Sequence, residues 1–282
     1  MSIPATYFGR LSRSGRAWVD GWRRIGVHAE FYAQTLRHIP DVLVRYKIEL
    51  LRLIAQMGLG TGALAVIGGT VVIVAFLTMT NGALSAVIGY NQLADIGVEA
   101  LTGFASAYFN VRLAAPITSG IALAATIGAG ATAQLGAMRI NEEIDALEVM
   151  GVRSIAYLVS SRVLAGVIVV IPLYCVAVLA AFLSTRVLTT LAYGQALGVY
   201  DHYFNTFLYP VDIVWSFVLA VSMAILIMLV HTYYGFNASG GPAGVGEAVG
   251  RAVRTSLVAS AVLTVFISLA LYGADGGFNL SG

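Results

Sequence analysis

Residues 163–185 read VLAGVIVVIPLYCVAVLAAFLST and contain no charged side chain. Arg162 precedes this stretch and Arg186 follows it, so its two ends are clearly marked. An α-helix of about 20 apolar residues crosses the roughly 30 Å hydrocarbon core of a membrane. The stretch is therefore predicted to be a membrane-spanning helix.

Four more stretches without Asp, Glu, Lys or Arg predict four more membrane spans. They lie between Arg52 and Asp95, between Arg112 and Arg139, between Asp212 and Glu247, and between Arg254 and Asp275. Allowing about 20 residues for each crossing, we place the five spans at 58–79, 113–134, 163–183, 213–233 and 255–271. Of all residues, 59% are hydrophobic and only 11% are charged, against about a quarter charged in soluble domains. The predicted fold class is therefore all-α, a polytopic membrane protein with about five transmembrane helices.

The sequence before the first span has a different pattern. Charged or polar residues recur there every three or four positions, with leucines between them. These residues are Asp41, Arg45, Glu49, Arg52 and Gln56. The pattern predicts an amphipathic helix at the cytoplasmic membrane surface, with packing on another subunit as the alternative. We therefore divide the chain into a cytoplasmic N-terminal segment, 1–56, and a transmembrane domain, 57–282.

The basic residues predict how the chain is oriented. Nine of the sixteen Lys and Arg residues precede the first span, and most of the others fall in loops on the same side. Cytoplasmic loops retain Lys and Arg, whereas translocated loops lose them. We expect a multi-pass protein of the cytoplasmic membrane, with the N-terminus in the cytoplasm and the C-terminus outside. The net charge of +2 then reflects topology, and no nucleic acid partner is expected.

Few ionisable groups lie within the predicted spans, which argues against an ion-coupled carrier or a channel. His231 is expected to be a hydrogen-bonded structural residue. The only lysine, Lys47, is followed by Ile48, so the chain has no Walker A motif, and it has no H-E-x-x-H or G-x-S-x-G motif. We therefore expect no enzyme, and no catalytic, cofactor-binding or metal site in this chain.

Residues 141–151, NEEIDALEVMG, are predicted to form a short cytoplasmic helix after the second span. Asn141 can cap its start and Gly151 can end it. Glu142 suits the positive end of the helix, and further apolar residues share one face. The acids favour docking to a basic partner, whereas a merely solvated acidic loop is the alternative.

Several motifs together resemble the YrbE/MlaE permeases of ABC lipid transporters. The resemblance is closest to the actinobacterial YrbE B-type partners of Mce proteins. The motifs are Arg112 with Pro116, residues 131–139 (ATAQLGAMR), then Glu142, Glu148 and Met150, then Ser160 with Arg162, and residues 240–246 (GGPAGVG). They occur in the order of the family and cover nearly the whole chain after its first forty residues.

The resemblance implies a coupling helix that docks into a cytoplasmic ABC ATPase dimer, which binds ATP and Mg. Its polar contacts would be Glu142, Glu143, Asp145 and Glu148, and its apolar contacts Ile144, Leu147 and Met150. It also implies a second homologous YrbE permease and Mce tunnel proteins. The cargo would be a lipid, such as a fatty acid, a mycolic acid or a sterol, imported across the cytoplasmic membrane.

Two further sets of residues follow from the resemblance. The lipid path would include Val72, Phe76 and Met79 toward the outer part of the first span, with Arg112 near the mouth for an anionic head group; each could instead face lipid or a neighbouring helix. Leu113, Thr126 and Gln134 stand where symmetric relatives have charged residues, which predicts an interface with an unlike permease. The alternatives to lipid transport are an ion-coupled carrier or channel, or a membrane scaffold subunit for Mce assembly.

Overall fold

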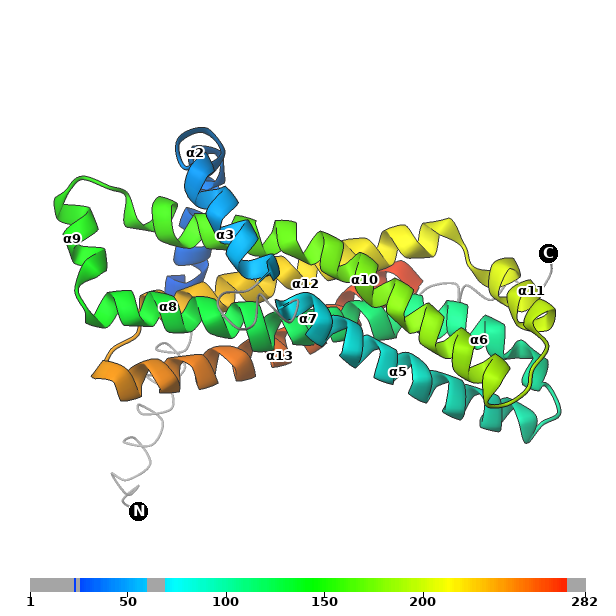
Figure 1. Ribbon diagram of the computed structural model, residues 1–282. Helices are drawn as coiled ribbons and strands as arrows, with labels where there is room; N and C mark the ends of the chain where they lie inside the picture. Colours follow the sequence, from blue (N-terminus) through cyan, green and yellow to red (C-terminus); the bar gives the residue numbers. More distant parts are fainter. Residues whose placement is uncertain (1–22, 24–25, 60–68, 273–282) are drawn as a thin grey trace, which may run out of the picture.

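The computed structural model describes residues 23, 26–59 and 69–272, which form an elongated bundle of helices (Figure 1). No β-strand occurs in this part of the chain, and five helices are long and apolar enough to cross a membrane. The predicted fold class is thereby confirmed. Residues 60–68 of the predicted first span and the tail after Tyr272, expected outside the membrane, fall beyond the described residues.

The five spans are long helices, and the second of them consists of three segments joined end to end. The spans are α5 (Gly69–Ala94); α6 (Thr102–Phe109), α7 (Ala115–Leu123) and α8 (Ala129–Ile140); α10 (Ser161–Leu191); α12 (Pro210–Phe236); and α13 (Gly241–Tyr272). The shorter helices are residues 26–37, α2 (Ile39–Arg45), α3 (Lys47–Leu59), a 3-10 turn (Glu99–Leu101), α9 (Glu143–Val149) and α11 (Leu197–Phe207).

The first span lies later in the sequence than expected. Its helix runs from Gly69 to Ala94, so the predicted position, 58–79, was wrong at its far end. The charge-free run after Arg52 is about twice as long as one membrane crossing, and hydropathy alone does not say which half crosses. Residues 58–59 belong instead to α3, which precedes the span.

The second span departs from α-helical geometry in two places. Residues 110–114 and 124–128 are π-helical turns that join α6 to α7 and α7 to α8. Pro116 follows the first of these turns inside the continuous span and has no N–H to donate, but Ser216 of α12 donates to the carbonyl oxygen of Val111, five residues before it. The backbone therefore stays hydrogen-bonded through the span, as a lipid environment requires.

Small residues bring the spans into close contact. A β-carbon at Gly82 of α5 would lie 2.5 Å from the carbonyl oxygen of Ala181 in α10. A β-carbon at Gly235 of α12 would lie 2.9 Å from the carbonyl oxygen of Thr132 in α8. Only glycine allows these backbones to approach so closely, which is how helices gain contact energy in lipid.

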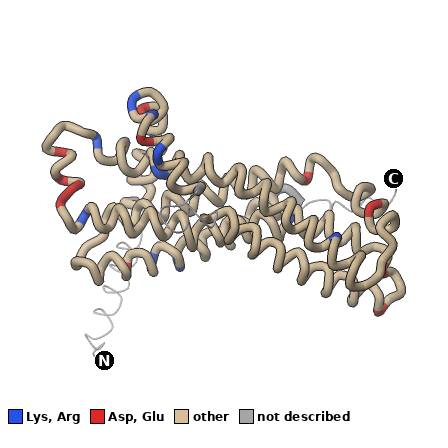
Figure 2. The backbone as a smooth tube through the Cα atoms, in the orientation of Figure 1, with Lys and Arg blue, Asp and Glu red and all other residues tan. Residues whose placement is uncertain are grey.

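The two ends of the bundle carry different short helices. α9 lies at one end and α11 at the other, while α2 and α3 project from the side near α9 (Figure 1). α11 is held by Tyr200, whose hydroxyl donates to Ser106 Oγ at 2.9 Å. Burial raises the pKa of Tyr200 to about 12, so it remains a neutral donor. Charged residues gather mostly toward these two ends (Figure 2).

Cysteine labelling tests this arrangement. The native Cys175 is first replaced in Cys175→Ala, and one cysteine is then placed at exposed Glu148 beside α9's end or at exposed His202 in α11. Because these positions lie at opposite ends of the bundle, a membrane-impermeant maleimide should label them from opposite sides of the membrane. The third span, α10, separates these two positions, so labelling of both from the same side would show that α10 does not cross the membrane.

Candidate functional site

α9 is a 7-residue helix that reverses the chain between the second and third spans. Glu142 precedes it with φ of 59°, in the left-handed region, which permits the sharp turn away from α8. The expected cap was wrong: Asn141 ends α8, and no side chain caps the start of α9. Gly151, with φ of 78°, ends α9 as predicted, since its N–H bonds the carbonyl of Glu148 at 2.9 Å.

One face of α9 packs inside the chain. Ile144 is fully buried and packs in one cluster with Leu135 of α8 and Leu158 at the start of the third span. Leu147 is half-buried against the same cluster. Ile144 was expected to seat in a partner, and this was wrong, because a helix held by two short connections buries the face that meets its own spans.

The opposite face of α9 is open. Val149 is 89% exposed and Met150 is 69% exposed, which leaves two large apolar side chains in solvent. Sequence reasoning missed Val149, although an apolar pair directly before the terminating glycine was a visible signal. Exposed apolar side chains rimmed by acids are typical of a protein contact.

The acids around α9 have different partners. Asp145 forms a salt bridge with Arg139 of α8 at 2.6 Å. Glu148 accepts a hydrogen bond from Ser154 Oγ at 2.5 Å. Glu142 and Glu143 are exposed, and the Glu143 carboxylate accepts a weak bond from Asn141 at 3.4 Å. All four predicted acids therefore remain on the accessible part of this end of the bundle.

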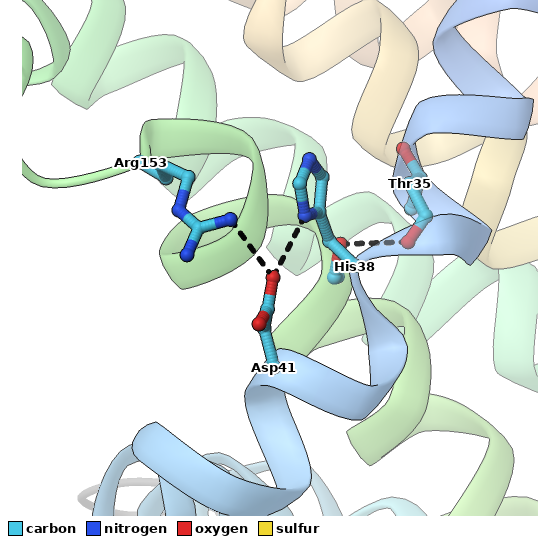
Figure 3. Close-up of polar contacts among 5 residues, drawn as sticks. Thr35, His38, Asp41 and Arg153 are labelled. Atoms are coloured by element: carbon cyan, nitrogen blue, oxygen red, sulfur yellow. Dashed lines mark hydrogen bonds and ion pairs between the residues drawn. The ribbon is translucent and has the colours of Figure 1, made fainter.

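The N-terminal helices are tied to the loop that follows α9 (Figure 3). The Asp41 carboxylate accepts hydrogen bonds from His38 Nδ1 at 3.0 Å and from Arg153 Nη1 at 3.1 Å. Ser160 Oγ donates to the carbonyl oxygen of Thr35 at 2.8 Å. The hydrogen bond from His38, followed by the charge of Arg153, holds the pKa of Asp41 below its ordinary value.

The predicted amphipathic helix is present but is broken into α2 and α3 at Tyr46. Leu50 and Leu53 of α3 are buried against Ala165 of α10. Ile48 and Leu51 point elsewhere and are exposed. One apolar face therefore packs on the bundle, and a second is free for lipid, which suits a helix at the membrane surface.

The predicted lipid-path residues of the first span lie on the exposed face of α5. Val72, Phe76 and Met79 are separated by four and three positions and are all exposed. They lie in the first half of α5, next to the α3 end, and not toward the outer part as expected. The shift follows from the later position of the span itself.

Arg112 is engaged within the chain. Its guanidinium forms a two-pronged contact with the Asp212 carboxylate, Nη2 to Oδ1 at 3.1 Å and Nε to Oδ2 at 3.2 Å, and lies 4.2 Å from the Tyr108 ring centre. Asp212 therefore already pairs with the charge that was expected to bind a lipid head group. Sequence reasoning missed Asp212, although it is the one acid in the first turn of α12.

The three predicted interface residues are spread along the second span. Thr126 and Gln134 line one cavity of about 350 Å³ between α3, α5 and α8, whereas Leu113 lies outside its lining. Leu113 and Thr126 are half-buried and Gln134 is exposed. The contact of these residues with another permease stays a prediction.

His231 joins three helices, as expected for a structural histidine. Its Nδ1 is 2.8 Å from Thr132 Oγ1 in α8, and its Nε2 is 3.1 Å from Ser256 Oγ in α13. The ring packs against Gly128, where a β-carbon would lie 2.7 Å from it. Both ring nitrogens are therefore used in holding α8, α12 and α13 together.

Comparison with known proteins covers the spans and α9 together. A sequence model of the protein family described as permease MlaE matches residues 60–270. A probable ABC transporter permease protein of Rickettsia bellii is 27% identical over 195 residues, covering 66% of this chain and 72% of that protein. The chloroplastic protein TRIGALACTOSYLDIACYLGLYCEROL 1 of Arabidopsis thaliana is 27% identical over 186 residues, covering 66% and 53%. A probable ABC transporter permease protein of Synechocystis sp. is 26% identical over 165 residues, covering 58% and 63%.

Removing the charge of Asp41 should loosen the N-terminal helices. Because the folded protein lowers this pKa from 3.8, the contact stabilises the protein fully above pH 3.8 and is lost as pH falls through the lowered pKa. The unfolding temperature of Asp41→Asn should therefore be slightly lower than that of wild type at pH 7. The difference between the two should disappear at acidic pH, where Asp41 of the wild type is protonated. Thermal unfolding followed by fluorescence measures this, with exposed Asp95→Asn as the control. Equal melting of Asp41→Asn and wild type at pH 7 would show that the contact contributes nothing.

Proposed function

Because the chain belongs to the MlaE permease family, we propose that it is the permease subunit of an ABC transporter that carries lipid across the cytoplasmic membrane. A separate ATPase dimer binds ATP and Mg and supplies the energy. The observation that carries the proposal is α9, a short acidic helix at the end of the bundle with one face anchored and the other open.

The shape of α9 suits the transmission of movement. Ile144 fastens α9 to α8 and to the start of the third span, so a force on α9 moves these spans as one body. Val149 and Met150 provide the apolar contact with the ATPase, and Glu142, Glu143, Asp145 and Glu148 provide the polar contacts. ATP binding then shifts the permease between two states without any chemistry in this chain.

A lipid cargo agrees with the surfaces of the spans. Val72, Phe76 and Met79 form an exposed apolar face on α5 that suits acyl chains. The Arabidopsis relative is named after a glycolipid, trigalactosyldiacylglycerol. We propose import from an Mce tunnel, with a fatty acid, a mycolic acid or a sterol as the cargo. The abundance of basic residues before the first span supports a cytoplasmic α9 and an α11 outside.

A second, unlike permease completes the proposed complex. Thr126 and Gln134 are neutral side chains of the second span that are not fully buried, and they suit packing against a partner with charged residues. Pairing with a distinct homologue would then be favoured over pairing with a second copy of this chain.

Positive charge added to the open face of α9 should uncouple lipid transport from the ATPase. Glu142→Lys combined with Val149→Lys puts two cations on the open face, where they would repel a basic ATPase cleft. ATP-dependent lipid transfer between vesicles should fall by about tenfold, with loss of ATPase co-purification, while membrane insertion is unchanged.

The matched control is Val27→Lys with Glu30→Lys, which adds the same charge to an exposed helix away from α9. Full transport and full ATPase binding by the α9 variant would remove the coupling role. In the same assay, transfer that needs an ion gradient but no ATP would indicate an ion-coupled carrier. An assembled complex that transfers no lipid under either condition would indicate a scaffold.

Expression of this chain without any second permease tests the unlike pair. We expect monomeric or unstable protein alone and a stable complex when a homologous but distinct permease is present, because the neutral Leu113, Thr126 and Gln134 offer no ionic contacts to a copy of themselves. Size-exclusion chromatography with light scattering measures the assembly. A stable homodimer that binds the ATPase would show that the pairing is wrong.

A further inference from the structure

Arg162, in the first turn of α10, is a buried cation with unused hydrogen-bond donors. The residue is 6% exposed, and within the described residues no carboxylate lies at salt-bridge distance from it. Its Nη1 donates to the carbonyl oxygen of Leu158 at 2.9 Å, its Nη2 lies 3.9 Å from Met138 Sδ, and its Nε has no hydrogen-bond partner. A guanidinium has five donors, and a buried charge left unpaired is costly, so this environment favours an anion.

Arg162 lines a cavity of about 480 Å³ between α3, α8, α9 and the start of α10. Arg52 and Gln56 of α3 and Gln134 of α8 line the same cavity and add further N–H donors. Such a group of donors around a buried cation matches the several acceptor oxygens of a phosphate or carboxylate head group.

Two carboxylates also line this cavity, but neither lies close enough to neutralise Arg162. Glu49 lies 3.6 Å from Arg52, so its charge is used on α3. Glu143 belongs to α9 and accepts from Asn141 at 3.4 Å. Arg162 therefore has no carboxylate in salt-bridge contact, although the charge of Glu49 acts on it from a greater distance.

The polar cavity continues into an apolar one. Leu53, Gln56 and Gln134 line both this cavity and the neighbouring cavity of about 350 Å³. Beyond the shared residues, the second cavity is lined by apolar side chains such as Met57, Ile73 and Ile127. A polar chamber with a buried cation outside any salt bridge, opening into an apolar chamber, fits an amphiphile better than it fits a small soluble anion.

We propose that these two cavities bind an anionic lipid, with its head group on Arg162 and its acyl chain along α3 and α5. This inference rests on the proposed function, because a lipid path whose cytoplasmic end lies at this site requires that the chain carries lipid. Glu143 links the site to α9: when α9 moves, a carboxylate moves at the wall of the cavity and changes the affinity for the anion.

Native mass spectrometry of the purified permease complex without ATP tests the site. The probes are phosphatidylglycerol, phosphatidylcholine with the same acyl chains, and inorganic phosphate. Wild type should bind phosphatidylglycerol about tenfold more tightly than phosphatidylcholine, as expected for one charge-assisted contact. Arg162→Gln should lose this preference, whereas Arg254→Gln, an exposed basic residue on α13, should keep it.

A second variant tests the same cavity if Arg162→Gln fails to fold. Ala137 is exposed and lines the cavity, so Ala137→Phe should fill the space and abolish the preference without changing any charge. Equal binding of the two lipids by wild type, or an undiminished preference in both variants, would overturn the proposal. Displacement of the bound lipid by inorganic phosphate at equal concentration would also overturn it, because the ligand would then be a soluble anion.

The readout is binding, so it separates this site from the transport function. A complex that prefers the anionic lipid through Arg162 yet transfers no lipid with ATP would refute the proposed function and leave the site intact. A complex that transfers lipid with ATP but shows no head-group preference would refute the site and leave the function intact.

Discussion

Hydrocarbon offers no hydrogen-bond partners, so every backbone N–H and C=O of a span must be satisfied within the protein. All five spans are accordingly helical, with π turns at 110–114 and 124–128 in the second span and at 155–160 at the start of the third. Lipid tails are as apolar as leucine, so the helices associate through close backbone contact instead of hydrophobic burial. Gly82 provides that contact between α5 and α10, and Gly235 provides it between α12 and α8.

The end of the bundle that carries α9 is a connected unit. Ile144 fixes α9 to α8 and to the third span, and Arg153 in the next loop holds Asp41 of α2. Ser160 then binds the backbone of the N-terminal helix at Thr35. A displacement of α9 therefore reaches α2 and α3 as well as the spans, and it changes the walls of the cavity around Arg162.

The sequence alone was sufficient for the class and for the existence of five spans, because a charge-free run of about 20 residues has few other solutions. The helices of the second and fifth spans begin earlier than expected, at Thr102 and Gly241 instead of 113 and 255. Sequence reasoning failed on the first span, where the run after Arg52 is long enough to contain two crossings. It also failed wherever the answer depended on which face of a helix meets the rest of the chain. Ile144 reads equally well as a docking residue or an anchor until α8 is seen beside it.

Polar contacts between residues far apart in the sequence could not be predicted for the same reason. The contact of Arg112 with Asp212 joins positions on two different spans, and no local pattern connects them. The cavity at Arg162 likewise takes its walls from four separate helices. By contrast, Gly151 could be predicted as the end of α9, because a helix terminator is set by its own backbone conformation.

Glu142 holds a backbone conformation that suits glycine better. With φ of 59°, its β-carbon crowds the following carbonyl oxygen, which costs about 1–2 kcal/mol relative to a relaxed residue. Glycine would relieve this strain and still allow the turn from α8 into α9. The molecule thus keeps a carboxylate at its corner at the expense of its own folding free energy, a compromise between stability and surface charge that, within the described residues, no other non-glycine position makes.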